Sequence, residues 1–247
     1  MSNFQQTEWS DASKAAYFTD YASRYIPDRG RTHELLASLL SGVLVPRFPG
    51  RALAVLELGS GDGALSGVLM RRHSNITLTL LDGSQEMLDG ARKRFGLGSQ
   101  VHYIQATLQD VIAGRVDLGT QHFVVSSLAV HHLTLAEKTD LFTCAAHALV
   151  PGGAFANIDV VLSPTECLEH WYLELWRDWI RQHDLDTADG KAFAHIPTQY
   201  KQNEDNFPDT LQDQLVGLSR SGFEAVDVFF KNGVFAVYGG FKPRLAE

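Results

Sequence analysis

The sequence predicts an α/β protein built on a doubly wound parallel sheet. Short apolar runs, typical of buried strands, alternate with amphipathic helical patterns along most of the chain. A glycine-rich loop joins the first apolar run to a helix, and Asn232-Gly233 joins the last two. Because Asn-Gly between β-rich runs is a strong hairpin signal, we expect the last strand to be antiparallel to its neighbour. Five core strands and this hairpin predict a seven-stranded sheet.

The first strand and its loop form the most informative stretch of the chain. Residues 52–58 are an apolar run, glycines follow at Gly59, Gly61 and Gly63, and a helical pattern resumes at residue 64. Glycines let a ligand approach the main chain closely, and a helix N-terminus favours polar or anionic groups. This stretch therefore predicts a backbone cradle for a ligand.

The remaining core elements follow in alternation. Ser84 is placed to cap one helix, and Thr134 with Glu137 forms a capping box at the start of another. Four further strands are expected, at residues 76–81, 101–106, 122–130 and 154–162. Ligands of such sheets bind beyond the carboxyl ends of the strands, so we expect the site there.

A sheet of this kind does not require residues 163–209. A helix is expected from Ser163 onward, with Trp and Tyr residues recurring at helical spacing. We interpret this insert as a cap over the strand ends; the alternative is a helix whose Trp stripe only docks on the core. The chain is then one domain: a helical lid (1–50), a core (51–162), the cap (163–209), and a terminal helix with a hairpin (210–247).

Composition excludes some functions and disfavours others. The formal net charge is −8 and no block rich in Lys and Arg occurs, which disfavours a nucleic-acid partner. No apolar run approaches the 18 residues of a membrane span. Cys144 and Cys167 lack metal-ligand spacing, so we expect no metal site and a cytoplasmic setting. The sequence leaves a monomer and a homodimer open.

Five motifs in order resemble the class I S-adenosylmethionine-dependent methyltransferases of the small-molecule type. The resemblance implies the seven-stranded Rossmann-like sheet with an antiparallel last strand, and S-adenosylmethionine as cofactor. The motifs are Glu57–Gly63, Asp82–Leu88, Gln105–Asp110, Ser126–Leu133 and Leu149–Gly153. A dinucleotide fingerprint wants a glycine where Ala64 stands, which favours the methyl donor over a nicotinamide cofactor.

The resemblance also implies a set of cofactor contacts. Asp82 is placed to accept hydrogen bonds from both ribose hydroxyls, and Thr107 stands where the family usually has an Asp facing the adenine. An aromatic residue of the opening helix, Tyr21 or Tyr25, would cover the sulfonium, and Arg29 or Arg31 would meet the carboxylate. The other expected contacts are Glu57, Gly59, Ser60, Gly61, Gly63, Gly83, Met87, Leu108, Ser126 and Ser127.

The acceptor side is less defined. His131 and His132 directly follow the fourth strand. For His131 a proton-accepting role and a structural role stay open, whereas for His132 the structural role is favoured. Candidate substrate contacts are His131, Trp171, Trp176, His195 and Tyr200.

The predicted activity is methyl transfer to O, N or C of a small metabolite that contains an aromatic group. The alternatives are a nucleotide-dependent oxidoreductase, a non-catalytic cofactor-binding or assembly module, and methylation of tRNA or protein.

Overall fold

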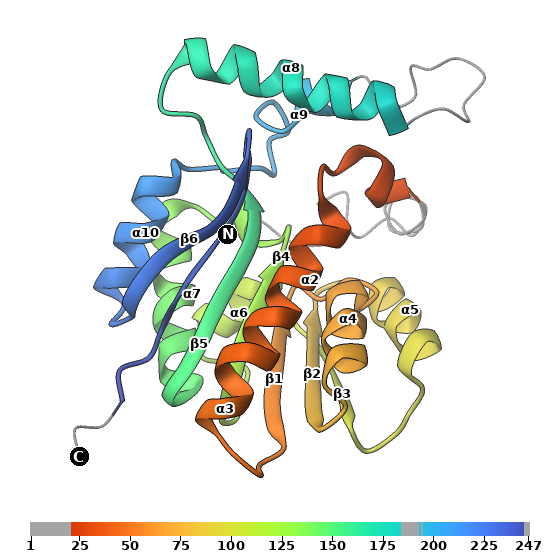
Figure 1. Cartoon of the computed structure of the whole chain (residues 1–247), viewed down its shortest axis with the longest axis vertical. Helices are drawn as coiled ribbons and strands as arrows, with labels where there is room; N and C mark the ends of the chain where they lie inside the picture. Colours follow the sequence, from red (N-terminus) through yellow and green to blue (C-terminus); the bar gives the residue numbers. More distant parts are fainter. Residues whose placement is uncertain (1–20, 184–192, 194, 245–247) are drawn as a thin grey trace.

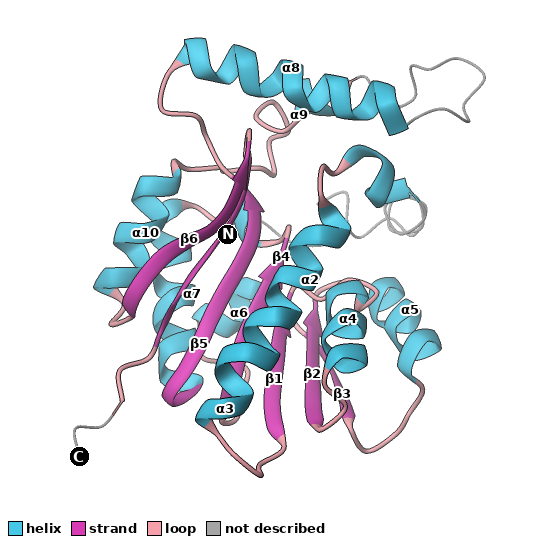
Figure 2. Ribbon diagram, in the orientation of Figure 1, coloured by secondary structure: helices cyan, strands magenta, loops and turns pink. Residues whose placement is uncertain are grey.

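The computed structural model describes residues 21–183, 193 and 195–244 and contains a seven-stranded sheet (Figures 1 and 2). The spatial order is β3-β2-β1-β4-β5-β7-β6. Strands β1 to β5 pair in parallel, and β7 is antiparallel to both β5 and β6. The predicted sheet and hairpin are confirmed. The strands are β1 Leu53–Leu58, β2 Ile76–Asp82, β3 Val101–Gln105, β4 Gln121–Ser127, β5 Leu149–Val160, β6 Glu224–Asn232 and β7 Phe235–Phe241.

Helices cover both faces of the sheet, as its sequence pattern requires. Strand β1 shows the cause: Leu53 and Val55 pack into one hydrophobic cluster, and Leu56 and Leu58 into the other. The first face carries α2 (Arg29–Leu39), α4 (Ala64–Arg72) and α5 (Gln85–Phe95). The second carries α6 (Leu108–Ile112), α7 (Leu135–Ala148) and α10 (Leu211–Arg220).

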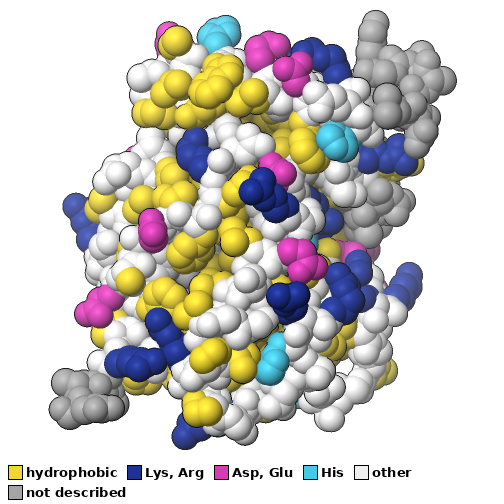
Figure 3. All heavy atoms as spheres, in the orientation of Figure 1, with side chains coloured by type: hydrophobic (Ala, Val, Ile, Leu, Met, Phe, Trp, Pro, Cys, Tyr) yellow, Lys and Arg dark blue, Asp and Glu magenta, His cyan; other side chains and the backbone are white. Residues whose placement is uncertain are grey.

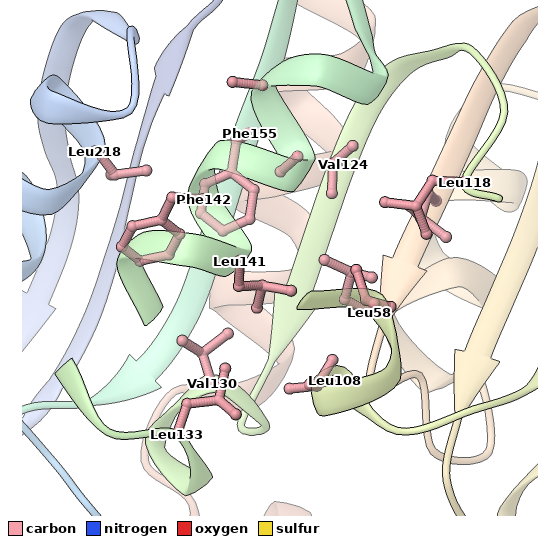
Figure 4. Packing of buried hydrophobic residues seen from close by; sticks show 14 of the residues in the cluster. Leu58, Leu108, Leu118, Val124, Val130, Leu133, Leu141, Phe142, Phe155 and Leu218 are labelled. Atoms are coloured by element: carbon pink, nitrogen blue, oxygen red, sulfur yellow. The ribbon is translucent and has the colours of Figure 1, made fainter. Parts of the chain in front are cut away.

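The second cluster is a close-packed layer of aliphatic and aromatic side chains. Figure 4 shows Val124 and Phe155 of the sheet lying against Leu141 and Phe142 of α7. The rings of Phe142 and Phe155 have centroids 5.3 Å apart. This packing fixes the carboxyl end of β4, from which η4 (Val130–His132) leads directly into α7. Val130 of η4 belongs to the same cluster.

The helix starts follow the capping signals. The Ser84 hydroxyl accepts from the Met87 N–H at 3.3 Å. Thr134 and Glu137 form the predicted capping box, in which the Glu137 carboxylate accepts from the Thr134 N–H at 2.9 Å. These caps satisfy N–H groups that a helix start otherwise leaves without a partner. Both helices therefore begin at the strand ends, beside the expected site.

Helix α2 continues through a wider π turn, η3 (Leu40–Leu44), into α3 (Val45–Arg47). Pro46 lies in this last segment; it lacks an N–H group, and in a regular α-helix its ring would clash with a carbonyl one turn earlier. The π turn widens the backbone at that point and lets the helix proceed. Leu36, Leu40 and Leu44 are fully buried on the sheet, so this part of the predicted lid is core packing. Residues 1–20 of it lie outside the described residues.

The cap region lies beyond the carboxyl ends of the strands. Helix α8 (Glu166–His183) crosses above them with the short α9 (Ile196–Gln199) beneath it (Figure 1). Trp176 is buried; its Nε1–H donates to the Tyr25 carbonyl at 2.6 Å, and its ring packs edge-on against Phe235. The Trp stripe therefore docks the helix on the core, as one of the two interpretations expected.

Most exposed residues of α8 are polar or charged, and some hydrophobic side chains are exposed beside them. Figure 3 shows hydrophobic side chains gathered over the helix at the top of the view, and Trp171 is 56% exposed. No helix in the described part of the chain combines the length and the apolar character that crossing a membrane requires.

Candidate functional site

A cavity opens at the carboxyl ends of β1, β2, β3 and β4, where the sequence predicts the site. Its walls come from the loops that follow these strands, from the start of α2 and from residues 204–207 of the insert. The lining includes Arg29, His33, Glu57, Gly59, Ser60, Gly61, Asp62, Asp82, Gly83, Met87, Thr107, Leu108, Gln109, Ser127, Leu128, Ala129, His132, Leu133, Glu204, Asp205 and Phe207. Residues that are distant in the sequence thus meet in one cavity.

The loop after β1 depends on glycine for two different reasons. Gly59 and Gly61 have φ values of +64° and +53°, in the left-handed region. A Cβ on Gly59 would lie 2.3 Å from the Cβ of Ala129, so this glycine lets the loop after β1 touch the loop after β4. A Cβ on Gly63 would meet the ring of Phe95 at 2.5 Å, and Gly63 does not line the cavity. Gly63 therefore serves packing.

Asp82 holds the cradle together from the end of β2. Its Oδ2 accepts from the Gly61 N–H at 2.7 Å, and its Oδ1 accepts from the Ser84 N–H at 2.8 Å. Burial raises the pKa of Asp82, and the two N–H groups oppose that rise. Each carboxylate oxygen keeps a second lone pair. Asp82 can therefore accept from a pair of vicinal hydroxyls while it fixes the loop.

Glu57 supports the same loop from below. Its side chain is almost fully buried and accepts from the Ser66 N–H at 3.1 Å and from the Ser66 hydroxyl. Burial raises the pKa of Glu57 to about 8. Of the two roles expected for Glu57, the structure shows the support of the loop and the start of α4.

The other end of the cavity is apolar with a polar rim. Met87 and Leu108 line it together with Gly83, Thr107 and Gln109. The Thr107 hydroxyl donates to Asp110 Oδ2 at 2.8 Å and accepts from the Asp110 N–H at 3.1 Å, which caps α6. One lone pair therefore remains on Thr107 for an amino group. Gln109 was not predicted as a site residue, and its position in the first turn of α6 was the available signal.

These residues fit S-adenosylmethionine. Asp82 suits the ribose, and the apolar end suits the adenine. The Ser60 hydroxyl is 95% buried, yet its oxygen has no hydrogen-bond partner among the described residues. An unsatisfied buried polar group costs about 1–3 kcal/mol, and a polar ligand group would remove this cost. Ser60 stands in the loop that is expected to line the methionine portion, so the cradle is shaped for a polar head group there.

The two histidines after β4 have unlike surroundings. His132 lines the cavity, and its Nδ1 lies 2.9 Å from the Asp205 carbonyl oxygen. His131 lies behind it: its Nδ1 is 2.6 Å from Oδ1 of the fully buried Asp159, and it does not line the cavity. Burial and the neighbouring His131 lower the pKa of His132 to about 3. The sequence leaves a proton-accepting and a structural role open for His131 and favours a structural role for His132, whereas in the structure His132 is the one that lines the cavity.

A buried polar network continues behind His131. The Asn157 amide donates to Asp159 Oδ2 at 3.2 Å and to the Tyr238 hydroxyl at 2.8 Å, and that hydroxyl donates to Gln214 Oε1. The neighbouring His131 lowers the pKa of Asp159 against the opposing effect of burial. This network ties η4 to β5, β7 and α10, so the histidine pair stands on a rigid base.

The last residues of the insert close the cavity opposite the glycine loop. We call residues 204–209 the return segment. The Phe207 N–H donates to the His131 carbonyl at 2.7 Å, and the Leu162 N–H donates to the Asp209 carbonyl at 2.9 Å. The ammonium of the fully buried Lys138 donates to the Phe207 carbonyl and contacts Asp209 Oδ2 at 2.5 Å. The return segment is therefore held on η4 and α7.

Several predicted contacts lie elsewhere. Tyr21 and Tyr25 pack against Phe193 at centroid distances of 5.8 and 5.4 Å. Arg31 lies 4.8 Å from the ring of Phe230, while Arg29, two residues earlier and on another side of the helix, lines the cavity. The Ser126 hydroxyl donates to the Leu58 carbonyl at 2.7 Å and joins two strands, whereas Ser127 does line the cavity. The structure thus gives Tyr21, Tyr25, Arg31 and Ser126 packing or structural surroundings.

The predicted substrate contacts in the cap are also not on the cavity wall. Trp171 is exposed, Trp176 is buried in the cap, and the Tyr200 hydroxyl faces Glu169 at 3.3 Å. His195 precedes α9 at the surface. The residues of the insert that do line the cavity are Glu204, Asp205 and Phe207. Their polar stretch has no helical or strand period, so no sequence pattern indicates that they line a cavity.

Comparisons with known proteins agree with this geometry. Residues 55–153 match the family described as "Methyltransferase domain". A curated relative, the carboxy-S-adenosyl-L-methionine synthase of Chromohalobacter salexigens, is 26% identical over 94% of this chain and 82% of its own. The enzyme of the same name from Nautilia profundicola is 21% identical over 94% of this chain and 93% of its own.

Solved structures share the fold. A putative O-methyltransferase from Nostoc punctiforme superposes with a TM-score of 0.61 at 17% identity, over 92% of this chain and 60% of that one. Human N-acetylserotonin methyltransferase in complex with SAM superposes with a TM-score of 0.52 at 17% identity, over 98% of this chain and 62% of that one. The chain spans less than two thirds of these solved chains. The sheet order, the cradle and the match of residues 55–153 to a methyltransferase domain agree with one another, and the chain is similar to S-adenosylmethionine-dependent methyltransferases in fold.

Proposed function

We propose that this enzyme transfers the methyl group of S-adenosylmethionine to O, N or C of a small metabolite that carries an aromatic part. The observation that carries the proposal is the position of His132. It stands on the cavity wall between the glycine cradle and the return segment. The cavity therefore extends past the donor cradle to a second set of polar residues, which is where an acceptor would lie.

Methyl transfer depends mainly on alignment of the two reactants. When bound, S-adenosylmethionine supplies an electrophilic methyl group. The cradle of Gly59, Gly61 and Asp82 orients the donor, and η4 with the return segment orients the acceptor and shields it from water. The residues of η4 and the return segment would hold the acceptor atom in line with that methyl group, and an oxygen or nitrogen acceptor would release a proton on this side of the cavity.

His132 is placed to orient the acceptor rather than to take up that proton, because a nitrogen with a pKa near 3 is only weakly basic. With a pKa near 3 it is neutral at physiological pH. The carbonyl of Asp205 can only accept, so this hydrogen bond assigns a proton to Nδ1 and fixes the tautomer of the ring. Because the imidazole is already neutral, we expect no loss of activity from its protonation until the pH is well below 6.

The aromatic part of the acceptor has support from Phe207. This residue lines the cavity and is 42% exposed, with Leu133 and Leu128 also on the wall. An exposed ring beside apolar side chains favours a flat apolar group. The earlier basis for an aromatic acceptor, the Trp residues of the insert, does not apply, since Trp171 and Trp176 lie off the cavity.

The charge of the return segment restricts the acceptor further. Glu204 and Asp205 line this end, and no Lys or Arg of the described residues joins them there. A neutral or cationic acceptor is therefore favoured over an anionic one, and the phosphates of tRNA would be repelled. The antiparallel β7 disfavours an oxidoreductase. A cytoplasmic location and a monomeric or homodimeric state stay predictions from the sequence.

The curated relatives suggest a second candidate, synthesis of a form of S-adenosylmethionine that carries a carboxyl group. The match over 94% of the chain favours it. The added carboxylate would need a cationic partner, and the described residues around His132 offer Glu204 and Asp205 instead. We therefore place methyl transfer first.

A labelled transfer assay tests the proposal. Purified full-length protein is incubated with methyl-labelled S-adenosylmethionine and panels of neutral, cationic and anionic aromatic acceptors, and methylated product, S-adenosylhomocysteine and carboxylated donor are followed by mass spectrometry. We expect label in neutral or amine acceptors, and a loss of turnover of about 10²-fold in His132→Ala, because the acceptor is then less well aligned. His195→Ala, an exposed histidine off the cavity, is the matched control and should keep full turnover. Carboxylated donor without methylated product would contradict methyl transfer.

A further inference from the structure

One polar side chain of the cavity has no task in the site described so far. His33 is 96% buried and lines the cavity, but its Nε2 has no hydrogen-bond partner among the described residues. Buried polar atoms in native proteins nearly always have a partner. On a cavity wall, a bound ligand can supply the hydrogen-bond partner that such an atom otherwise lacks.

The surroundings of His33 define which part of a ligand would reach it. His33 follows Arg29 by one helical turn on α2, so both stand on one face of the helix, and both line the cavity. Glu57, Gly61 and Asp62 of the β1 loop region line the cavity as well, whereas Thr107, Leu108 and Gln109 line it from α6. Asp62 and Glu57 are close enough to Arg29 to raise its pKa against burial. His33 thus belongs to the end that is expected to hold the amino-acid part of the donor.

The local charge favours an anion at this nitrogen. Burial, Arg29 and Arg71 together lower the pKa of His33 to about 3. The ring is therefore neutral, and one of its nitrogens carries a hydrogen that it can donate. A cationic group would be repelled by the same arginines, whereas a carboxylate is attracted by them and accepts the hydrogen bond.

We propose that His33 is a further residue of the methyl-donor site, whose Nε2–H donates a hydrogen bond to the carboxylate of the donor's methionine part. The inference rests on the donor named under the proposed function and adds the residue that selects its carboxylate. Arg29 supplies charge at the same end, and His33 supplies a directed donor. Sequence reasoning missed His33 because a histidine in an amphipathic helix carries no distinguishing signal.

Calorimetric titration with three ligands tests this proposal. S-adenosylhomocysteine carries the whole amino-acid part, decarboxylated S-adenosylmethionine lacks only the carboxylate, and methylthioadenosine lacks the amino-acid part. The protein variants are the wild type, His33→Phe, which keeps the ring volume without the hydrogen bond, and His33→Gln, whose amide places an N–H near the position of Nε2.

We expect His33→Phe to weaken S-adenosylhomocysteine about 10-fold or more, as for the loss of a hydrogen bond to a charged group. The affinities for methylthioadenosine and for decarboxylated S-adenosylmethionine should stay within about twofold, and His33→Gln should recover most of the loss. Equal loss with methylthioadenosine, or no loss with S-adenosylhomocysteine, would overturn the proposal. An undiminished effect on decarboxylated S-adenosylmethionine would overturn the carboxylate assignment.

The ligand-free stability gives a second readout. Because His33→Phe removes a buried nitrogen without a partner, the ligand-free variant should melt at or above the temperature of the wild type. A clearly lower melting temperature would show that His33 serves the fold instead. Failure of the wild type to bind any of the three ligands would count against the donor itself, which separates that result from a failure of the His33 assignment.

Discussion

The two ends of the cavity are built in different ways. The donor end comes from short loops that directly follow β1, β2 and β3, and its contacts join residues that are close to a strand end. The acceptor end joins η4 to the return segment, about seventy residues later in the chain, through the pairs His132–Asp205 and Lys138–Asp209. The donor end is thus fixed by local turns on the sheet, and the acceptor end by a few distant contacts. The residues of the acceptor end can therefore vary without a change in the donor end.

The largest expected effect is a loss of stability on substitution of Lys138, which holds the acceptor end and does not contact the donor loops. Lys138→Met removes the buried ammonium that holds Asp209 and the Phe207 carbonyl. Leaving the Phe207 carbonyl and Asp209, whose side chain is 22% exposed, without this partner should lower the free energy of unfolding by about 2–3 kcal/mol. Urea unfolding measures this change. S-adenosylhomocysteine binding to the folded fraction should persist, because the donor loops are untouched.

Two matched variants control this prediction. Asp209→Asn keeps a hydrogen-bond acceptor and should cost less. Arg115→Ala breaks the exposed ion pair with Asp110, in which the Arg115 side chain is 64% exposed, and should change the stability by less than about 1 kcal/mol. A Lys138→Met protein no less stable than Arg115→Ala would show that the return segment is not held by this pair.

An intermediate effect is expected where the two ends touch. Gly59→Ala and Gly61→Ala share the cost of a positive φ, about 1–2 kcal/mol. Gly59→Ala also brings a Cβ to 2.3 Å from that of Ala129, whereas at Gly61 the nearest atom is Met87 Sδ at 3.8 Å. Thermal melting of the ligand-free proteins should show Gly59→Ala to be the less stable. Adding Ala129→Gly to Gly59→Ala should restore the level of Gly61→Ala. Without that recovery, the close approach of the two loops would be refuted.

The smallest effect concerns Glu57 and pH. Its folded-state pKa of about 8 lies above the ordinary value of 4.5, so the folded protein holds a proton that the unfolded chain releases. Stability from this proton is present below pH 4.5 and is lost as the pH rises through 8. Between pH 7 and pH 9 the wild type should lose about 1 kcal/mol relative to Glu57→Gln, which cannot ionise. Parallel stability curves for the two proteins would contradict the buried, protonated state.

The same contrast explains what the sequence could predict. The succession of strands and helices, the hairpin at Asn232-Gly233 and the glycine cradle after β1 follow from periodicity and turn chemistry, which are local. Which of the two histidines lines the cavity could not be predicted in this way. Their hydrogen-bond partners, Asp159 for His131 and Asp205 for His132, come from distant parts of the chain. Arg29 and Arg31 could not be separated for a related reason: Phe230, which Arg31 contacts, is about 200 residues away.

Phe207 and Asp205 show most clearly which cavity residues a sequence pattern does not predict. Nothing in their polar stretch indicates a cavity wall. They reach the wall because the Phe207 N–H donates to the His131 carbonyl and because the buried Lys138 holds the segment that follows. A sequence pattern describes an element's own faces, whereas these contacts depend on where an irregular segment returns to the fold.

The central claim is that the cradle between β1 and β2 binds the methyl donor. Calorimetric titration of the full chain with S-adenosylhomocysteine tests it most directly, with Asp82→Ala alongside. We expect 1:1 binding to the wild type and an affinity at least about 100-fold lower in the variant, since each hydrogen bond to a charged group contributes about 1.5–3 kcal/mol and two ribose hydroxyls are involved. Absence of binding to the wild type at millimolar ligand, or equal affinity in the two proteins, would contradict it.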